Sequence, residues 1–237
     1  PGARQRVEVM LAESALTMAS LGLEFKQLNG RLNFDERQGL TAKNLYGKFF
    51  QQPFSASITS NPVAKTTHVQ AKGAAAASAL TDWIKRPELS FVEGLLPFNA
   101  DLTLFHGERK ADKARLQIRS NLRGASVSLP PPFVKLAAEE KPLAVHINMG
   151  ESSTHYSINY ADQAQFELLQ SSTESPRMAL GLQQAAKLPE LASFSIAGQV
   201  ERFDFLTWRE TYERYQGFVE TLTSAQQRAT ITSEMAD

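Results

Sequence analysis

The stretch RLQIRSNLRGASVSLPPPFVKLAAEEKPLAVHINM, residues 115–149, predicts the fold more clearly than any other part of the chain. Leu116 and Ile118 alternate with polar neighbours, and the same alternation resumes at the end of the stretch. A period of two places the apolar side chains on one face of a β-strand. Proline has no N–H for a sheet, so we expect 130–132 to end the first strand, with one helical turn over 133–138. The segment therefore predicts two strands joined by a corner.

Alternation with a period of two recurs along most of the chain, for example over 54–58 and 156–160. Turns rich in Asn, Pro and Gly separate these runs, as is typical of strands joined by short connections. We predict about a dozen strands of about five or six residues each, most of them antiparallel neighbours. The fold is therefore expected to be mainly β.

One helix is predicted near the C-terminus, beginning at Thr207, because Thr207 and Glu210 have the spacing of a capping box. The apolar residues that follow keep a helical period, and they are Trp208, Tyr212, Tyr215, Val219 and Leu222. We expect this stripe to dock on the sheet. A second, short helix is predicted over 78–85. Both tryptophans, Trp83 and Trp208, are expected to pack in a core.

A short pattern is repeated along the chain. LNGRLNFD at 28–35 is echoed by IAGQVERFD at 196–204, and LRG at 122–124 is a partial third copy. A glycine inside a strand indicates a bulge or a close approach of another backbone. Repeated strand units of this kind predict an extended sheet that grows by addition of strands.

Composition excludes several classes of protein. The chain has 237 residues, and its 25 basic and 25 acidic residues cancel, whereas nucleic-acid binders normally have a basic excess. There is no cysteine, which excludes disulfides and cysteine-based metal sites. The chain begins Pro-Gly-Ala-Arg, and strand-like alternation starts by Val7, so we expect a segment of a longer protein. We expect 1–224 to be a single elongated β-rich segment and 225–237 to be a polar tail or the start of the next repeat.

Motifs for chemistry are absent from the sequence. It has no nucleophile elbow, phosphate-binding glycine loop, zinc-protease helix motif or dinucleotide fingerprint. The four histidines do not have the spacing of a metal site, and the basic residues Arg115, Arg119 and Arg123 are interpreted as a solvated outer face. We therefore expect no catalytic residues, no metal and no cofactor, and we rank an enzyme, such as a polysaccharide hydrolase on a β-scaffold, last among the alternatives.

Many strands carry an apolar row, but few helices are predicted to cover those rows. An apolar face must be buried against something. One solution is a closed sandwich, and the other is a sheet curled into a groove that hydrocarbon chains fill. The residues predicted to share the groove face are Leu102, Leu104, Leu116, Ile118, Leu143, Val145, Ile147, Tyr156 and Ile158. Those predicted on the opposite face are Thr103, Gln117, His146 and Ser157.

Three stretches resemble the AsmA-like family of bacterial envelope proteins, in particular its YhdP branch. They are LNGRLNFDERQGLTAKNLYGKFFQQPFSASI at 28–58, SNLRGASVSLPPPFVKLAAEEKPL at 120–143 and FSIAGQVERFDFLTW at 194–208. The motifs they are similar to are spacings of glycine, proline and apolar residues. The first stretch departs from the pattern at Gln51-Gln52-Pro53, where the family has a glycine.

The resemblance implies a mainly β fold: an extended, curled antiparallel sheet with an apolar groove face, one C-terminal helix and one or two short helices. It also implies a periplasmic location, with the full-length protein anchored in the inner membrane of a Gram-negative bacterium. The expected function is movement of phospholipid toward the outer membrane. The expected partners are phospholipid acyl chains and, through other parts of the full-length protein, both membranes, with no nucleic acid. The alternative is a non-enzymatic scaffold of the cell envelope with a sealed β-sandwich core.

Overall fold

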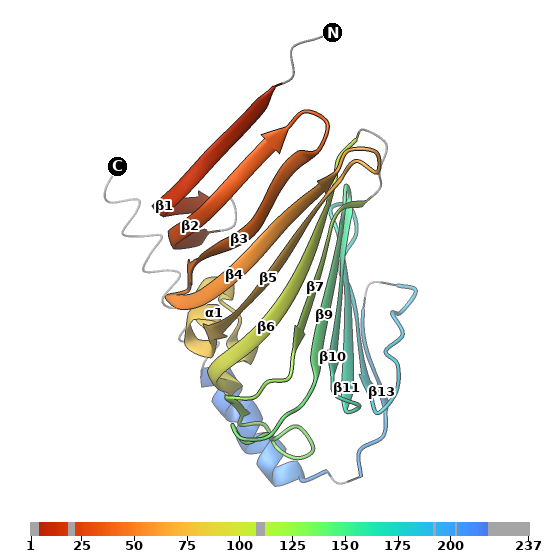
Figure 1. Ribbon diagram of the computed structural model, residues 1–237. Helices are drawn as coiled ribbons and strands as arrows, with labels where there is room; N and C mark the ends of the chain where they lie inside the picture. Colours follow the sequence, from red (N-terminus) through yellow and green to blue (C-terminus); the bar gives the residue numbers. More distant parts are fainter. Residues whose placement is uncertain (1–4, 19–21, 108–111, 192, 202, 218–237) are drawn as a thin grey trace, which may run out of the picture.

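The computed structural model describes residues 5–18, 22–107, 112–191, 193–201 and 203–217. Thirteen strands in these ranges form one sheet (Figure 1), which confirms the predicted mainly β fold. They are β1 (Arg6–Met18), β2 (Leu23–Asp35), β3 (Gly39–Phe49), β4 (Gln52–Asn61), β5 (Thr66–Ala76), β6 (Val92–Phe105), β7 (Asp112–Ser120), β8 (Ala125–Val127), β9 (Leu143–Gly150), β10 (Ser153–Tyr160), β11 (Ala164–Ser171), β12 (Arg177–Leu182) and β13 (Phe194–Gly198). The helical segments are α1 (Ala77–Ile84), the 3-10 helix η2 (Pro87–Phe91) and a C-terminal helix over 205–217.

Each strand pairs with the next in an almost unbroken meander from β1 to β13, and only β8 lies off this path, paired with the start of β6. The pairs are antiparallel as predicted, except that β13 runs parallel to β12. A parallel neighbour requires the chain to return along the sheet before it pairs. Residues 183–191 make the described part of this return, and they pass so close to Gly181 that a β-carbon there would meet the Gln184 carbonyl oxygen.

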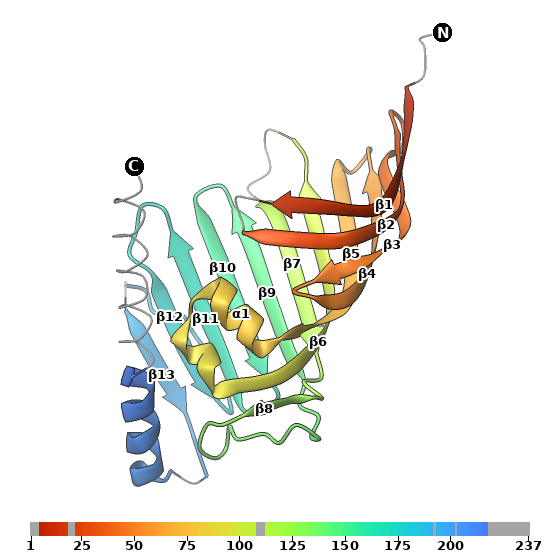
Figure 2. The ribbon, with the colours of Figure 1, turned by 90° about the vertical axis from the view of Figure 1, so that its left-hand side faces the viewer.

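The sheet is curved but does not close on itself, and α1 lies on its concave side (Figures 1 and 2). No second sheet covers it among the described residues, which excludes the sealed sandwich. Only eleven apolar residues are buried in the described chain, and six of these are alanines. The accessible surface of the chain is 15962 Å², whereas a compact protein of this mass has roughly 10,600 Å². The fold is therefore a single layer rather than two layers around a core.

The repeated glycines lie where another backbone approaches closely, as predicted. At Gly30 φ is +140°, and a β-carbon would lie 2.5 Å from the Asn44 carbonyl oxygen. At Gly198 φ is +134°, and a β-carbon would lie 2.0 Å from the Leu182 carbonyl oxygen. Gly124 of the partial copy lies in a turn rather than a strand. Only glycine fits the first two positions without moving a neighbouring strand.

Residues 121–142, which we call the lysine corner, differ from the prediction. β7 ends at Ser120, well before the prolines, and the chain then forms β8. There is no helical turn over 133–138, where Lys135 instead makes an isolated β-bridge to Val127. The reason is that Lys135 is buried and its ammonium group binds the carbonyl oxygens of Ala125 and Leu136 at 2.7 and 3.0 Å. These contacts fix an extended segment in place of a helix.

The C-terminal helix begins two residues earlier than predicted. Asp204 caps it, because its side chain accepts hydrogen bonds from the N–H groups of Leu206 and Thr207 at 3.1 and 3.2 Å. The helix docks on η2 and the lysine corner rather than on the sheet: Arg214 donates to the Ser128 carbonyl oxygen at 2.9 Å. Tyr212, predicted in the docked stripe, is 60% exposed.

The other members of the predicted stripe have separate outcomes. Trp208 packs edge-on against Phe133, with ring centroids 5.9 Å apart. Tyr215 contacts η2 rather than the sheet, because its hydroxyl donates to the Glu88 carboxylate at 3.4 Å. Val219 and Leu222 lie outside the described residues. The short helix is confirmed within one residue at each end, but its Trp83 is 38% exposed and is not part of a core.

Candidate functional site

One face of the sheet carries a continuous apolar row across ten strands, β3 to β7 and β9 to β13. Residues paired directly across a ladder point to the same face. The pairing therefore aligns ten apolar side chains, one from each strand: Ala42, Ile58, Val69, Leu102, Leu116, Ile147, Tyr156, Leu168, Met178 and Phe194. We call this the first row, and no polar side chain interrupts it.

A second row lies two residues along each strand, or three on β3 where a bulge separates Ala42 from Leu45, and it is apolar as well. It contains Leu45, Ala56, Ala71, Ala100, Ile118, Val145, Ile158, Phe166, Leu180 and Ile196. Strands lie about 4.8 Å apart, so ten of them span about 43 Å along the rows. The two rows and their flanking apolar residues define what we call the apolar face.

All nine residues predicted for the groove lie on the apolar face. Six of them lie in the two rows and pair directly with one another, for example Leu116 with Ile147 and Ile147 with Tyr156. Leu102 is also in the first row, Leu104 lies one row above it, and Leu143 one row below the second. All nine side chains are partly exposed, neither buried nor fully solvated. This is the burial expected of side chains that have lateral neighbours but no opposing layer.

The prediction missed the part of the rows that crosses β3, β4, β5, β11, β12 and β13. Alternation was visible in those segments too, for example at Leu168 and Leu180. What the sequence of one strand does not contain is its register against the next strand. The length of the rows therefore had to come from the pairing.

The opposite face of the sheet is polar. Gln117, His146 and Ser157 are consecutive partners across three strands, with Glu167 next in line, and Thr103 pairs with Arg115 on the same face. These four predicted positions therefore lie together on what we call the polar face.

Glu167 on the polar face gathers three neighbours. Its carboxylate accepts from the Ser157 hydroxyl at 2.6 Å and from Gln165 at 2.7 Å, and the His155 ring nitrogen lies 2.6 Å from its other oxygen. The serine hydroxyl bonds the carboxylate rather than the imidazole, so the group lacks the base-activated hydroxyl of a nucleophilic site. The two hydrogen bonds satisfy one oxygen of a carboxylate that is 7% exposed, and the imidazole contacts the other only as an ion-pair neighbour.

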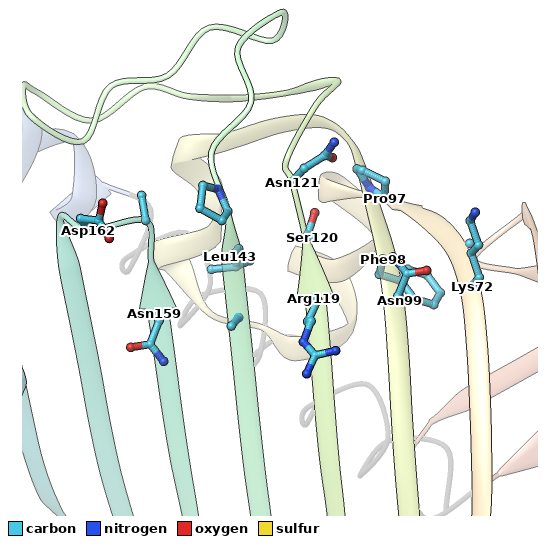
Figure 3. A pocket seen from close by; sticks show the side chains of 14 residues that line it. Lys72, Pro97, Phe98, Asn99, Arg119, Ser120, Asn121, Leu143, Asn159 and Asp162 are labelled. Atoms are coloured by element: carbon cyan, nitrogen blue, oxygen red, sulfur yellow. The ribbon is translucent and has the colours of Figure 1, made fainter.

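A hollow of about 600 Å³ lies on the polar face near the ends of β6, β7, β9 and β10 (Figure 3). It exists because Ala144 is small, whereas its partners across the ladder, Arg119 and Asn159, are long. Lys72 and Asp162 complete its charged lining. The three charged side chains are all exposed, so water reaches the hollow and the charges need no bound partner.

The lower ends of the strands close the apolar face with aromatic side chains. Phe49 has Phe25 stacked on it with centroids 5.0 Å apart, and Phe98 edge-on at 6.3 Å. Phe50 continues the cluster to Trp83 of α1, with centroids 5.8 Å apart. Helix α1 therefore stands over this end of the apolar face, inside the curve in Figure 2.

The upper ends of β4 and β5, toward the hairpins at the top of Figure 1, carry polar side chains on the same face, whereas Leu104 and Met149 keep the row apolar farther along. Thr67 lies in the row of Leu104, beyond the first row. Its hydroxyl is 2.8 Å from the His106 ring nitrogen and 2.9 Å from the Ser60 hydroxyl. We call Ser60, Thr67 and His106 the polar rim.

The described residues contain no cluster of three or more His, Asp or Glu side chains placed to hold a metal ion. In the same part of the chain, no helix has the length and apolar character needed to cross a membrane.

The model of the YhdP protein family matches residues 2–235, almost the whole chain. The chain belongs to the YhdP family. The resemblance seen in the three sequence stretches is thereby confirmed. Searches of curated proteins and of solved structures found no match. The matched residues include every strand that contributes to the apolar face, so this face lies wholly within the YhdP family region.

Proposed function

We propose that this chain forms part of a track for phospholipid acyl chains between the inner and outer membranes of a bacterial envelope. The observation that carries the proposal is the unbroken pair of apolar rows on a face that no second layer of described residues covers. Lipid chains on that face would replace water over the apolar side chains that they cover. Membership of the YhdP family supports the envelope setting.

The dimensions of the apolar face favour a track over a pocket for one lipid. The rows extend about 43 Å across ten strands at 4.8 Å spacing. The hydrocarbon core of a bilayer is about 30 Å thick, so the chains of one leaflet reach only about 15 Å. A surface almost three times that length suits a ligand that moves from strand to strand.

The energetic need for such a surface is large. Exposing one methylene to water costs about 0.8 kcal/mol, so two acyl chains of about 15 methylenes each would cost on the order of 20 kcal/mol. A continuous apolar face lowers this barrier at every step, whereas a break in the rows would restore part of it. The proposed role is non-enzymatic and the location periplasmic, with the membrane anchor in another part of the full-length protein.

The test is a charge placed in the middle of the first row. Ile147→Asp puts a carboxylate where acyl chains must pass, and burying it under a chain unpaired costs several kcal/mol. The face is open, so water can reach the carboxylate when lipid is absent, and we expect the variant to stay folded. The measurement is mass spectrometry of lipid copurified with the protein, with folding followed by circular dichroism.

The matched control is Gln117→Asp, which adds the same charge next to this position but on the polar face. We expect Ile147→Asp to lose bound lipid and Gln117→Asp to retain it. A folded Ile147→Asp protein that carries the wild-type amount of lipid would contradict the track. An Ile147→Asp protein that fails to fold would favour a scaffold in which this face is sealed by a partner.

A further inference from the structure

The apolar face is asymmetric along its strands, and this asymmetry bears on how a lipid would lie. The lower end is aromatic and is covered by α1, whereas the upper end carries hydroxyl and imidazole groups. We infer that phospholipids bind this face in one orientation, with acyl chains directed to α1 and the phosphate head at the polar rim. This inference rests on the proposed function and adds the site of the head group and of the chain ends.

Where α1 covers it, at β4 to β6, the lower end is lined by aromatic and aliphatic side chains, and Ser120 and Tyr160 lie in the same row farther along the sheet. Phe98 pairs across Gly73 to Phe54 one row below the second row, and the glycine lets the two rings converge, since a β-carbon there would lie 2.9 Å from that of Phe54. Trp83 and Ile84 of α1 are 38% and 44% exposed. These exposed side chains sit at the one place where the described apolar face has a second wall. The end therefore suits the terminal part of a hydrocarbon chain.

The polar rim offers groups that bind phosphate. The hydroxyl of Thr67 links Ser60 to His106 in a chain of contacts of 2.9 and 2.8 Å. The His106 backbone N–H donates to the Lys65 carbonyl oxygen at 2.7 Å, and the Lys65 stem lies within 3.6 Å of a β-carbon built on Gly107. Thr67 is buried, and the Ser60 hydroxyl also donates to the Leu40 carbonyl oxygen at 2.9 Å. The groups left to meet a phosphate beside the hairpin are therefore the exposed Lys65 and His106 side chains, which the two hydroxyls help to position. Charge complementarity with a phosphate is the reason for placing the head here.

The distance between the two ends matches the length of a chain. Thr67 and Gly73 lie on the same strand, six residues apart, which is about 20 Å at 3.3 Å per residue. The chains of one lipid leaflet reach about 15 Å. A phosphate at the polar rim therefore places the chain ends close to the aromatic cluster, with the chains crossing both rows. Movement along the track would then be sideways, from one strand to the next.

The chain has no cysteine, so single-cysteine variants can be labelled at one defined place. We would attach a bimane fluorophore at Ile84→Cys on α1 or at Val63→Cys, which is 96% exposed in the hairpin beside the rim, and load the protein from phosphatidylglycerol vesicles. The vesicles contain phosphatidylcholine with a nitroxide either on the head or near the chain end. Protein is separated from vesicles by gel filtration before quenching is measured. Leu96→Cys, two residues from Phe98 on the same face and partly exposed, replaces Ile84→Cys if labelling of α1 impairs folding.

We expect the ratio of chain-end to head quenching to exceed one at position 84 and to fall below one at position 63. A label at Gln117→Cys on the polar face should be quenched by neither lipid. Reversed ratios, or equal ratios at the two sites, would overturn the orientation while leaving lipid binding intact. Absence of quenching at both sites in folded protein would contradict the proposed function itself, and the orientation with it.

Discussion

The apolar face and the lysine corner use similar side chains in opposite ways. In the first row the residues predicted for the groove are all partly exposed, although every one has apolar neighbours on both adjacent strands. In the lysine corner Leu122 is 4% exposed and Ala125 is fully buried, and even the charged Lys135 is 1% exposed. The corner is sealed and the face is open. The difference indicates that stability is concentrated at the end of the sheet, which leaves the face free for a ligand.

The sealed corner is built by hydrogen bonds to backbone groups as much as by apolar packing. Val127 and Lys135 exchange backbone hydrogen bonds at 2.9 and 3.1 Å. Lys141 donates to the Val134 carbonyl oxygen and to the Gln163 side chain at 3.2 and 3.0 Å, and its ammonium lies over the Tyr160 ring. Two lysines therefore hold a loop that has little regular structure. Among the described residues, no loop is held over the open face by lysine hydrogen bonds of this kind.

The largest expected difference between the two regions is their tolerance of a buried carboxylate. Leu122→Asp places a charge in the sealed corner, where burying it unpaired and losing the leucine together destabilise the fold by several kcal/mol. We expect the midpoint of urea unfolding to fall far more for Leu122→Asp than for Ile147→Asp on the open face. Leu122→Ala, with an expected loss of about 2–5 kcal/mol, separates the cavity from the charge. Equal losses at the two sites would remove the distinction between open and sealed.

The sequence predicted what depends on neighbours along one strand and missed what depends on contacts across the fold. Alternation assigned Ile147 to the apolar face and His146 to the polar face, because a period of two needs no knowledge of the partner strand. The parallel pairing of β13 was not predicted, since only the path of the preceding residues determines it. Asp204 was overlooked as a helix cap because Thr207 offered a second capping pattern nearby.

The helical turn predicted over 133–138 failed for a reason that lies far along the chain. The apolar and charged residues there are compatible with a helix. In the structure, however, the Lys135 ammonium satisfies the carbonyl oxygen of Ala125, ten residues away. A buried lysine with backbone partners leaves no periodic signal in the sequence. The predicted burial of Trp83 in a core also failed. Its side chain is 38% exposed, because the described sheet has no second layer that could cover it.

A smaller effect is expected from Lys135 itself. Lys135→Met keeps a long side chain but removes the donor to the Ala125 and Leu136 carbonyl oxygens. Buried acceptors left without a donor cost about 1–3 kcal/mol, and removal of the buried charge offsets part of this. We expect a net loss of stability in urea unfolding, smaller than for Leu122→Asp. Unchanged or increased stability would mean that desolvation of the ammonium outweighs its hydrogen bonds, and that apolar packing alone seals the corner.

The smallest expected effect is a dependence of the free energy of unfolding on pH, which we expect from the lysine corner and not from the apolar face. Burial lowers the pKa of Lys135 below its usual value, and nearby Lys141 adds to this, whereas Glu139 opposes it. The unfolded chain therefore binds more protons than the folded one between the lowered pKa and 10.5, and the Lys135 contribution to stability rises with pH in that window. Burial raises the pKa of Tyr160, which acts in the opposite direction above 10.0.

Tyr160 is present in both wild type and Lys135→Met, so the difference between their unfolding free energies isolates the lysine. We expect that difference to move in favour of wild type as the pH rises toward 10.5, and the same comparison for Ile147→Ala on the open face to stay flat. A flat difference for Lys135→Met would show that water reaches this ammonium and that the corner is not sealed.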